Sequence, residues 1–186
     1  MPLSGIQWVS KFPTSRSLDD LSEPFRGNAS RFVAALRAAN ASVSIADTRR
    51  PTERAYLMHF SFAIAREGQD PAGVPAKQGV DIQWAHTDSL GNPDLAASQA
   101  AAEQMVQGYG IQFKPVLDSR HIQGLAIDMT ITWQSALTIT DGSGAQRIIS
   151  SLPRNGAQNA DLHQLGVAFG VKKLVTDPPH WSSDGR

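Results

Sequence analysis

The clearest strand pattern of the chain and its most unusual polar residues lie in one segment, residues 119–133, SRHIQGLAIDMTITW. Gly124 can turn the chain without steric cost. From Leu125 onward, small or polar residues alternate with large apolar ones, as in a strand with one buried face. This alternation places the carboxyl group of Asp128 opposite the apolar side chains, and His121 can fold back toward it from before the turn. We therefore expect a strand that presents a polar site.

A second polar group lies near residue 180, in residues 177–181, DPPHW. Two imidazoles and one carboxylate are a common ligand set for a catalytic zinc, with a fourth position left for water. We therefore predict that His121, Asp128 and His180 bind one Zn²⁺ ion. The two prolines restrict the backbone before the last ligand, so Asp177 is held close enough to act as the base on a water molecule. This constellation indicates a metal-dependent hydrolase.

A positive charge is also expected beside the metal. Attack on an amide carbonyl generates an oxyanion, which a fixed cation or hydrogen-bond donor can stabilise. Arg49 and Arg50 closely follow a predicted strand over residues 42–46. Either arginine could supply this charge, against the alternative of a solvated pair at the start of a helix.

Three further residues are candidates for substrate binding. Ser119 is expected to brace the site by hydrogen bonding, because no His–acid pair is placed to activate it as a nucleophile. His86 could line a substrate groove, and its alternative is a surface histidine. Trp181 could form a wall of the cleft or fill space in the core.

Length and composition restrict the class of protein. With 186 residues, the chain is expected to form one catalytic domain over 1–186, with an irregular extension at 1–27 and a long surface loop at 67–91. The absence of Cys excludes thiol nucleophiles and Cys-ligated metals. The 17 basic and 17 acidic residues balance, so no nucleic-acid partner is expected. No secretory signal and no membrane-spanning segment is recognisable.

The order of the elements predicts an α+β fold. Apolar periodicity and breaker residues predict helices first and a series of short strands after them. The predicted helices cover residues 28–40, 52–65, 93–107 and 159–169. The predicted strands cover residues 42–46, 112–117, 125–133, 136–140, 146–149 and 172–175.

The two polar segments resemble those of a known family. Residues 119–128 match every fixed position of SxHxxGxAxD, the signature of the zinc D-Ala-D-Ala carboxypeptidase and L-alanyl-D-glutamate peptidase family. Residues 177–181 are similar to the terminal block of that family. The resemblance implies Asp177 as the general base and His180 as the third zinc ligand. It also implies a small antiparallel sheet that cradles zinc, packed against several helices.

A third segment, residues 47–57, is similar to the family's strand-to-helix segment, in which an arginine contacts the substrate. A Gln commonly stands five residues after that arginine, and this chain has Arg54 there. Counting back from Arg54 identifies Arg49 as the catalytic arginine, with the adjacent Arg50 as a substrate-binding alternative.

The resemblance covers roughly residues 42–66 and 111–181 and implies peptidoglycan as the substrate. We expect a zinc peptidase that cleaves stem peptides as an L-alanyl-D-glutamate endopeptidase, since Asp rather than Glu at position 177 is typical of endolysin-type members. A monomeric phage endolysin would be made in the host bacterial cytoplasm and reach the cell wall through a membrane pore, without inserting into the membrane.

Three alternatives remain open. Within the family, the chain could be a D-Ala-D-Ala carboxypeptidase or dipeptidase. A bacterial cytoplasmic enzyme that recycles wall peptides would have the same sequence features. Outside catalysis, it could be a zinc-containing cell-wall-binding module, although a purely structural zinc usually has four protein ligands rather than three.

Overall fold

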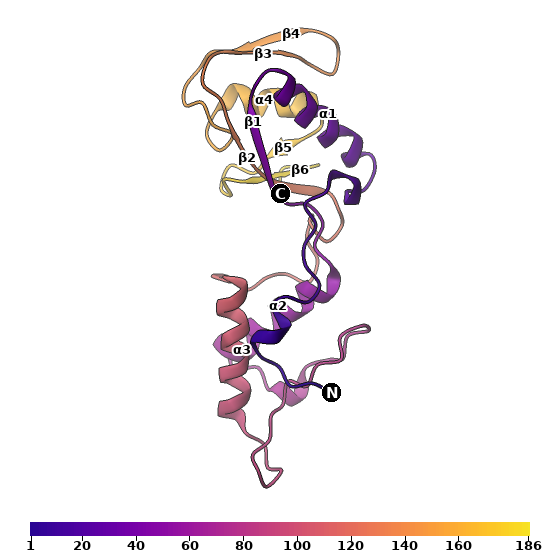
Figure 1. The fold of residues 1–186 in the computed structure, drawn as a ribbon, viewed down its shortest axis with the longest axis vertical. Helices are drawn as coiled ribbons and strands as arrows, with labels where there is room; N and C mark the ends of the chain where they lie inside the picture. Colours follow the sequence, from indigo (N-terminus) through magenta and orange to yellow (C-terminus); the bar gives the residue numbers. More distant parts are fainter. The chain divides into compact units, whose positions relative to one another are not determined.

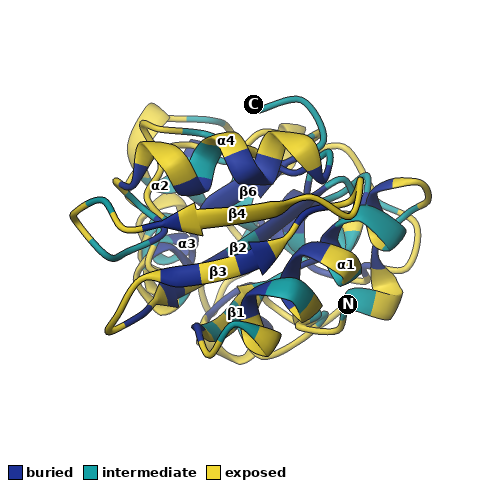
Figure 2. Cartoon of the chain, turned by 90° about the horizontal axis from the view of Figure 1, so that it is seen from above, coloured by how far each residue is buried: buried dark blue, intermediate teal, exposed yellow.

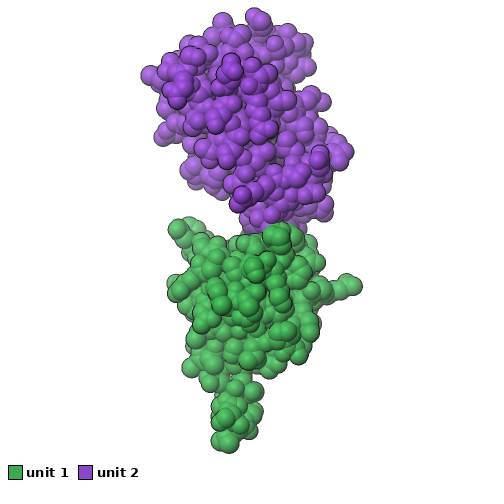
Figure 3. Space-filling view, in the orientation of Figure 1, with its two compact units in different colours: residues 1–13, 51–118 green, residues 14–50, 119–186 purple.

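The computed structural model describes all 186 residues, and they divide into two compact units (Figure 3). Unit 1 contains residues 1–13 and 51–118, and unit 2 contains residues 14–50 and 119–186. Each unit has its own hydrophobic core. This division into two units was not predicted from the sequence. That residues 1–186 act together as one catalytic domain stays a prediction.

Unit 2 is built on a small antiparallel sheet with the strand order β1-β2-β6-β5 (Figure 1). Its strands are β1 (Ser42–Asp47), β2 (Ala126–Thr132), β6 (His180–Ser182) and β5 (Lys172–Lys173). Two helices, α1 (Phe25–Ala38) and α4 (Ala160–Ala168), contribute to the core on one side of this sheet. Their buried residues face the strands (Figure 2). The fold is thus mixed α and β, as predicted.

Alternation along β2 explains which side of the sheet is covered. Ile127, Met129 and Ile131 are buried in the core, whereas Thr130 and Thr132 are exposed on the other face. Side chains two residues apart in a strand share a face, so Asp128 belongs to the face that the helices leave uncovered. The strand predicted over residues 125–133 is confirmed.

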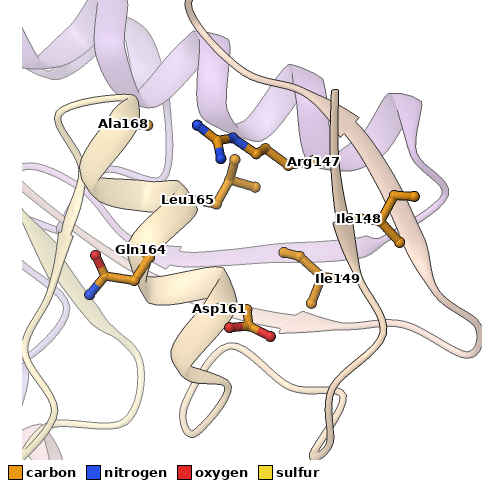
Figure 4. Close-up of a pocket in the computed structure, with 7 residues that line it drawn as sticks. All are labelled: Arg147, Ile148, Ile149, Asp161, Gln164, Leu165 and Ala168. Atoms are coloured by element: carbon orange, nitrogen blue, oxygen red, sulfur yellow. The ribbon is translucent and has the colours of Figure 1, made fainter. Parts of the chain in front are cut away.

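A separate hairpin completes unit 2. Strands β3 (Leu137–Thr140) and β4 (Gln146–Ile149) pair with each other in a two-stranded antiparallel sheet. Asp141 closes the turn by accepting hydrogen bonds from the Ser143 and Ala145 backbone N–H groups, at 2.9 and 3.1 Å. A cavity between β4 and α4 is lined by Arg147, Ile148, Ile149, Asp161, Gln164, Leu165 and Ala168 (Figure 4). These residues include none of the predicted metal ligands.

Unit 1 is helical. Helices α2 (Thr52–Glu67) and α3 (Leu95–Tyr109) pack against each other around a second core. After Glu67, the last residue of α2, the segment to residue 91 carries only one short 3-10 helix, as expected for a long loop. Three of its residues are nevertheless buried in that core: Val80, Ile82 and Trp84. The indole N–H of Trp84 donates to the Tyr56 hydroxyl at 3.1 Å. This segment is therefore partly a core segment and not only a surface loop.

Several boundaries differ from the predictions. The irregular 1–27 segment contains two 3-10 helices, and α1 begins at Phe25, three residues earlier than expected. The strand predicted over residues 112–117 does not form. Strand β6 was not predicted. No helix has both the length and the apolar character needed to cross a membrane.

Candidate metal centre

Three side chains converge on the uncovered face of the sheet in unit 2. Asp128 on β2 pairs across the strands with His180 on β6, and His121 lies in the turn before β2. The three facing atoms are His121 Nε2, Asp128 Oδ1 and His180 Nδ1, and every pair of them is 3.1–3.2 Å apart. The predicted grouping of these residues is confirmed. The three residues, which form the metal group, could hold a metal ion.

In each histidine, the ring nitrogen that faces away from the group contacts a main-chain oxygen. This outer contact determines which ring nitrogen is free to bind a metal. His121 Nδ1 lies 2.8 Å from the main-chain oxygen of Thr48, and His180 Nε2 lies 3.1 Å from that of Arg186. A carbonyl oxygen only accepts hydrogen bonds, so each of these nitrogens carries the proton. A neutral imidazole then has its lone pair on the other nitrogen, which faces the centre of the group. This is the usual arrangement of metal-binding histidines.

The spacing of the ligand atoms fits zinc. In a tetrahedral site with bonds of about 2.0–2.1 Å, neighbouring ligand atoms are about 3.3–3.4 Å apart. The observed 3.1–3.2 Å is close to this edge length. Three acceptor atoms at such distances repel one another unless a positive charge lies between them, and a bound metal ion would supply that charge.

Charge effects within the group also favour a cation. Burial raises the pKa of Asp128, but hydrogen bonds and charge from the two histidines outweigh burial and hold it well below its ordinary value. Burial lowers the pKa of His121, but Asp128 and the Thr48 carbonyl together raise it above its ordinary value. Asp128 is therefore an anion under ordinary conditions and gives the group a negative charge.

The turn that carries His121 is fixed by local contacts. Gly124 has a φ of +70°, which favours glycine, and a Cβ there would lie 2.7 Å from Ser22 Oγ. Ser119 Oγ accepts a long hydrogen bond from the Ile122 backbone N–H at 3.4 Å. Ser119 thus contacts the turn that carries His121. Its role in substrate binding stays a prediction.

Asp177 lies in a tight turn just before β6. Its main-chain oxygen accepts hydrogen bonds from the His180 backbone N–H at 3.1 Å and from Lys173 Nζ at 2.5 Å. Its carboxylate is exposed and does not belong to the three-residue group. Its role as the general base stays a prediction.

Lys173 is a buried cation whose role was not predicted from the sequence. Besides Asp177, its ammonium group donates to the main-chain oxygens of His180, at 3.1 Å, and Leu174. Burial lowers its pKa, against the opposite effect of Asp177 and Asp128. Lys173 therefore ties together both ends of the turn that presents His180. An isolated Lys in a short strand carries no sequence signal for this role.

The two arginines occupy different environments. Arg49 is exposed. Arg50 is half-buried, its backbone N–H donates to the His121 main-chain oxygen at 3.1 Å, and its charge lowers the pKa of His121. Arg50 Nη2 contacts Asp47 Oδ2 at 3.3 Å, while buried Arg50 Nε has no hydrogen-bond partner. Arg50 is thus the arginine whose charge acts on the metal group.

Trp181 and His86, the two aromatic candidates for substrate binding, lie in different environments. The Trp181 side chain is completely buried and packs against Phe32 and His163, with ring centroids 5.5 and 5.6 Å away. The prediction that it binds substrate is therefore wrong, because it points to the core face of β6. His86 belongs to unit 1, where Nε2 lies 2.9 Å from Ser4 Oγ. Its role in substrate binding stays a prediction.

Comparison with known proteins finds no family model that matches the chain and no matching curated protein.

Proposed function

We propose that the protein is a zinc peptidase that hydrolyses peptide bonds in the stem peptides of bacterial peptidoglycan. The observation that carries this proposal is the convergence of His121, Asp128 and His180 with the spacing of a tetrahedral zinc site. Three protein ligands leave one position for water or substrate, as in catalytic sites. The resemblance of the two polar segments to the peptidase family supports the substrate class.

The side chains around the metal group suit amide hydrolysis. When bound, zinc would polarise the scissile carbonyl and lower the pKa of a water molecule. Asp177, on the exposed turn before His180, would accept the proton of the attacking water. Arg50, whose side chain is partly exposed, would stabilise negative charge on the carbonyl oxygen through its guanidinium charge.

The uncovered face of the sheet offers a surface for the peptide. Beyond Asp128, exposed Thr130 and Thr132 continue along β2. A groove beside them is bordered by residues 155–157 and 178–179. The substrate would lie in this groove, with the carbonyl group of its scissile bond at the metal group.

More specifically, we propose an L-alanyl-D-glutamate endopeptidase of the phage endolysin type. On this proposal, a monomer made in the host cytoplasm reaches the wall through a membrane pore. Asp rather than Glu at position 177 supports the endopeptidase over the D-Ala-D-Ala carboxypeptidase of the same family.

Digestion of purified sacculi tests these proposals. Zinc-loaded protein is expected to release stem-peptide fragments with new amino termini, identified by mass spectrometry, while His121→Ala and Asp177→Ala release none. Release of terminal D-Ala alone would identify a carboxypeptidase instead. If the wild type and Asp177→Ala bind zinc equally and both leave the wall intact, the protein is a binding module and the proposed activity is wrong.

A further inference from the structure

Residues 183–186 form a turn whose last residue contacts the outer ring nitrogen of His180, a member of the metal group. The Ser183 backbone N–H donates to the Leu125 main-chain oxygen at 3.0 Å, which ties this segment to the start of β2. Ser182 Oγ accepts hydrogen bonds from the Gly185 and Arg186 backbone N–H groups, at 2.9 and 3.1 Å. The resulting turn brings the main-chain oxygen of Arg186 to His180 Nε2.

Asp184 is the centre of this turn. Its Oδ2 accepts hydrogen bonds from the guanidinium of Arg186, at 2.8 and 3.0 Å, and from Arg120 Nη2. Its Oδ1 accepts from the Arg186 backbone N–H at 3.2 Å. The hydrogen bond from Arg120 is the largest of the effects that hold the pKa of Asp184 well below its ordinary value. One carboxylate thus organises both arginines.

Arg120 connects this turn to the other histidine. It directly precedes His121, and its Nη1 donates to Gln123 Oε1 at 2.6 Å within the same turn. The Arg120 main-chain oxygen also accepts a hydrogen bond from the Leu125 backbone N–H at 2.7 Å. The Arg120–Asp184 ion pair therefore joins the segment that carries His121 to the segment behind His180.

We propose that Asp184 is a positioning residue of the metal centre. It holds Arg186 so that the Arg186 main-chain oxygen accepts the Nε2–H of His180, which fixes the ring and leaves Nδ1 facing the centre of the three-residue group, where a metal ion would bind. The Arg120–Asp184 pair thereby sets metal affinity without touching the ion. This inference rests on the proposed zinc site. None of the sequence motifs includes Asp184 or Arg120 in a functional role.

The test compares Asp184→Ala with two matched variants. Asp184→Glu keeps the negative charge, and Asp19→Ala removes an exposed carboxylate from another part of unit 2. Zinc affinity is measured by competition with a chromogenic chelator. Loss of an outer hydrogen-bond partner of a metal ligand typically weakens binding by about 10–100-fold. We expect that loss for Asp184→Ala, partial rescue in Asp184→Glu and wild-type affinity in Asp19→Ala.

A second readout does not need the metal. In ¹⁵N-labelled, zinc-free protein, the His180 Nε2–H signal is visible by NMR when its hydrogen bond slows exchange with water. Asp184→Ala should lose this signal and keep the His121 Nδ1–H signal, because the Thr48 oxygen that accepts it is unchanged. Arg120→Ala should behave in the same way, and it replaces Asp184→Ala if that variant does not fold.

The outcomes separate the two proposals. If the wild type binds no zinc, the proposed function fails, while the His180 signal still decides the role of Asp184. If Asp184→Ala and Arg120→Ala retain both wild-type zinc affinity and the His180 signal, the positioning role is wrong.

Discussion

The two histidines of the metal group use different ring nitrogens, and the backbone decides which. His121 faces the centre with Nε2 and His180 with Nδ1, because the opposite nitrogen of each ring donates to a main-chain oxygen. Thr48, which holds His121, directly follows β1 and is completely buried. A substitution that displaces this backbone would therefore affect the metal group without removing a ligand.

Arg50→Ala should lower kcat/KM for stem-peptide hydrolysis by about 10²–10³-fold, the typical cost of losing a donor to an oxyanion, with zinc affinity retained. Arg49→Ala is the matched control and should stay close to wild type, because that side chain is exposed. Steady-state kinetics on a soluble muropeptide would measure both. A larger loss for Arg49→Ala than for Arg50→Ala would reverse the assignment.

At the scale of elements, α4 lies so close to the sheet that one of its positions has no room for a side chain. A Cβ at Gly166 would lie 2.5 Å from the Val171 main-chain oxygen and 2.8 Å from Trp181 Cζ3. Gly166→Ala should therefore destabilise unit 2 by about 1–3 kcal/mol, the usual cost of overpacking. Urea denaturation measures this change.

Gly27, in α1, provides the matched control for this substitution. It is also helical, but the nearest contact of a Cβ would be Glu23 Oε2 at 3.4 Å, the end of a flexible side chain. Gly27→Ala should be neutral or stabilising by up to about 1 kcal/mol, because Ala has the higher helix propensity. Equal effects at the two positions would contradict the close packing of α4.

The β3–β4 hairpin should be sensitive to pH through Asp141. Hydrogen bonds from Ser143 and Arg147 hold the pKa of Asp141 well below its ordinary value. Because the folded pKa is lowered, the carboxylate contributes stability above the unfolded pKa, and this contribution is lost as pH falls toward the folded pKa. The melting temperature of Asp141→Ala should therefore be below that of wild type at neutral pH, and the gap should narrow below about pH 4. A difference in melting temperature that does not change with pH would contradict this role of the Asp141 carboxylate.

At the scale of the whole molecule, all three metal ligands belong to unit 2, and unit 1 has a separate core. Zinc at 100 times its Kd should stabilise the structure that binds it by about 2.7 kcal/mol. Hydrogen exchange followed by mass spectrometry should show slower exchange in β2 and β6 on zinc addition, and no change in α2 or α3. His180→Ala should abolish the effect. Protection spread equally over both units would indicate that they unfold together.

Much of the metal group was predictable because its signals are local. The alternation along residues 125–133, the glycine in the turn before it and the two ligand-bearing segments can be read within about ten residues each. Helix boundaries were close for the same reason, since Pro51 stands directly before α2 and Gly110 directly after α3. The failed strand over residues 112–117 shows the limit, because a short apolar run also occurs in irregular chain.

Local sequence is enough to predict the residues able to bind a metal and the face of β2 on which Asp128 lies, since strand alternation and side-chain chemistry act over a few residues. The folded structure was needed to show that the chain has two cores, that Trp181 is buried, that Arg50 contacts His121 while Arg49 is exposed, and that Asp184 organises the turn after β6. Each of these depends on contacts between distant segments, whose pairing no local pattern specifies.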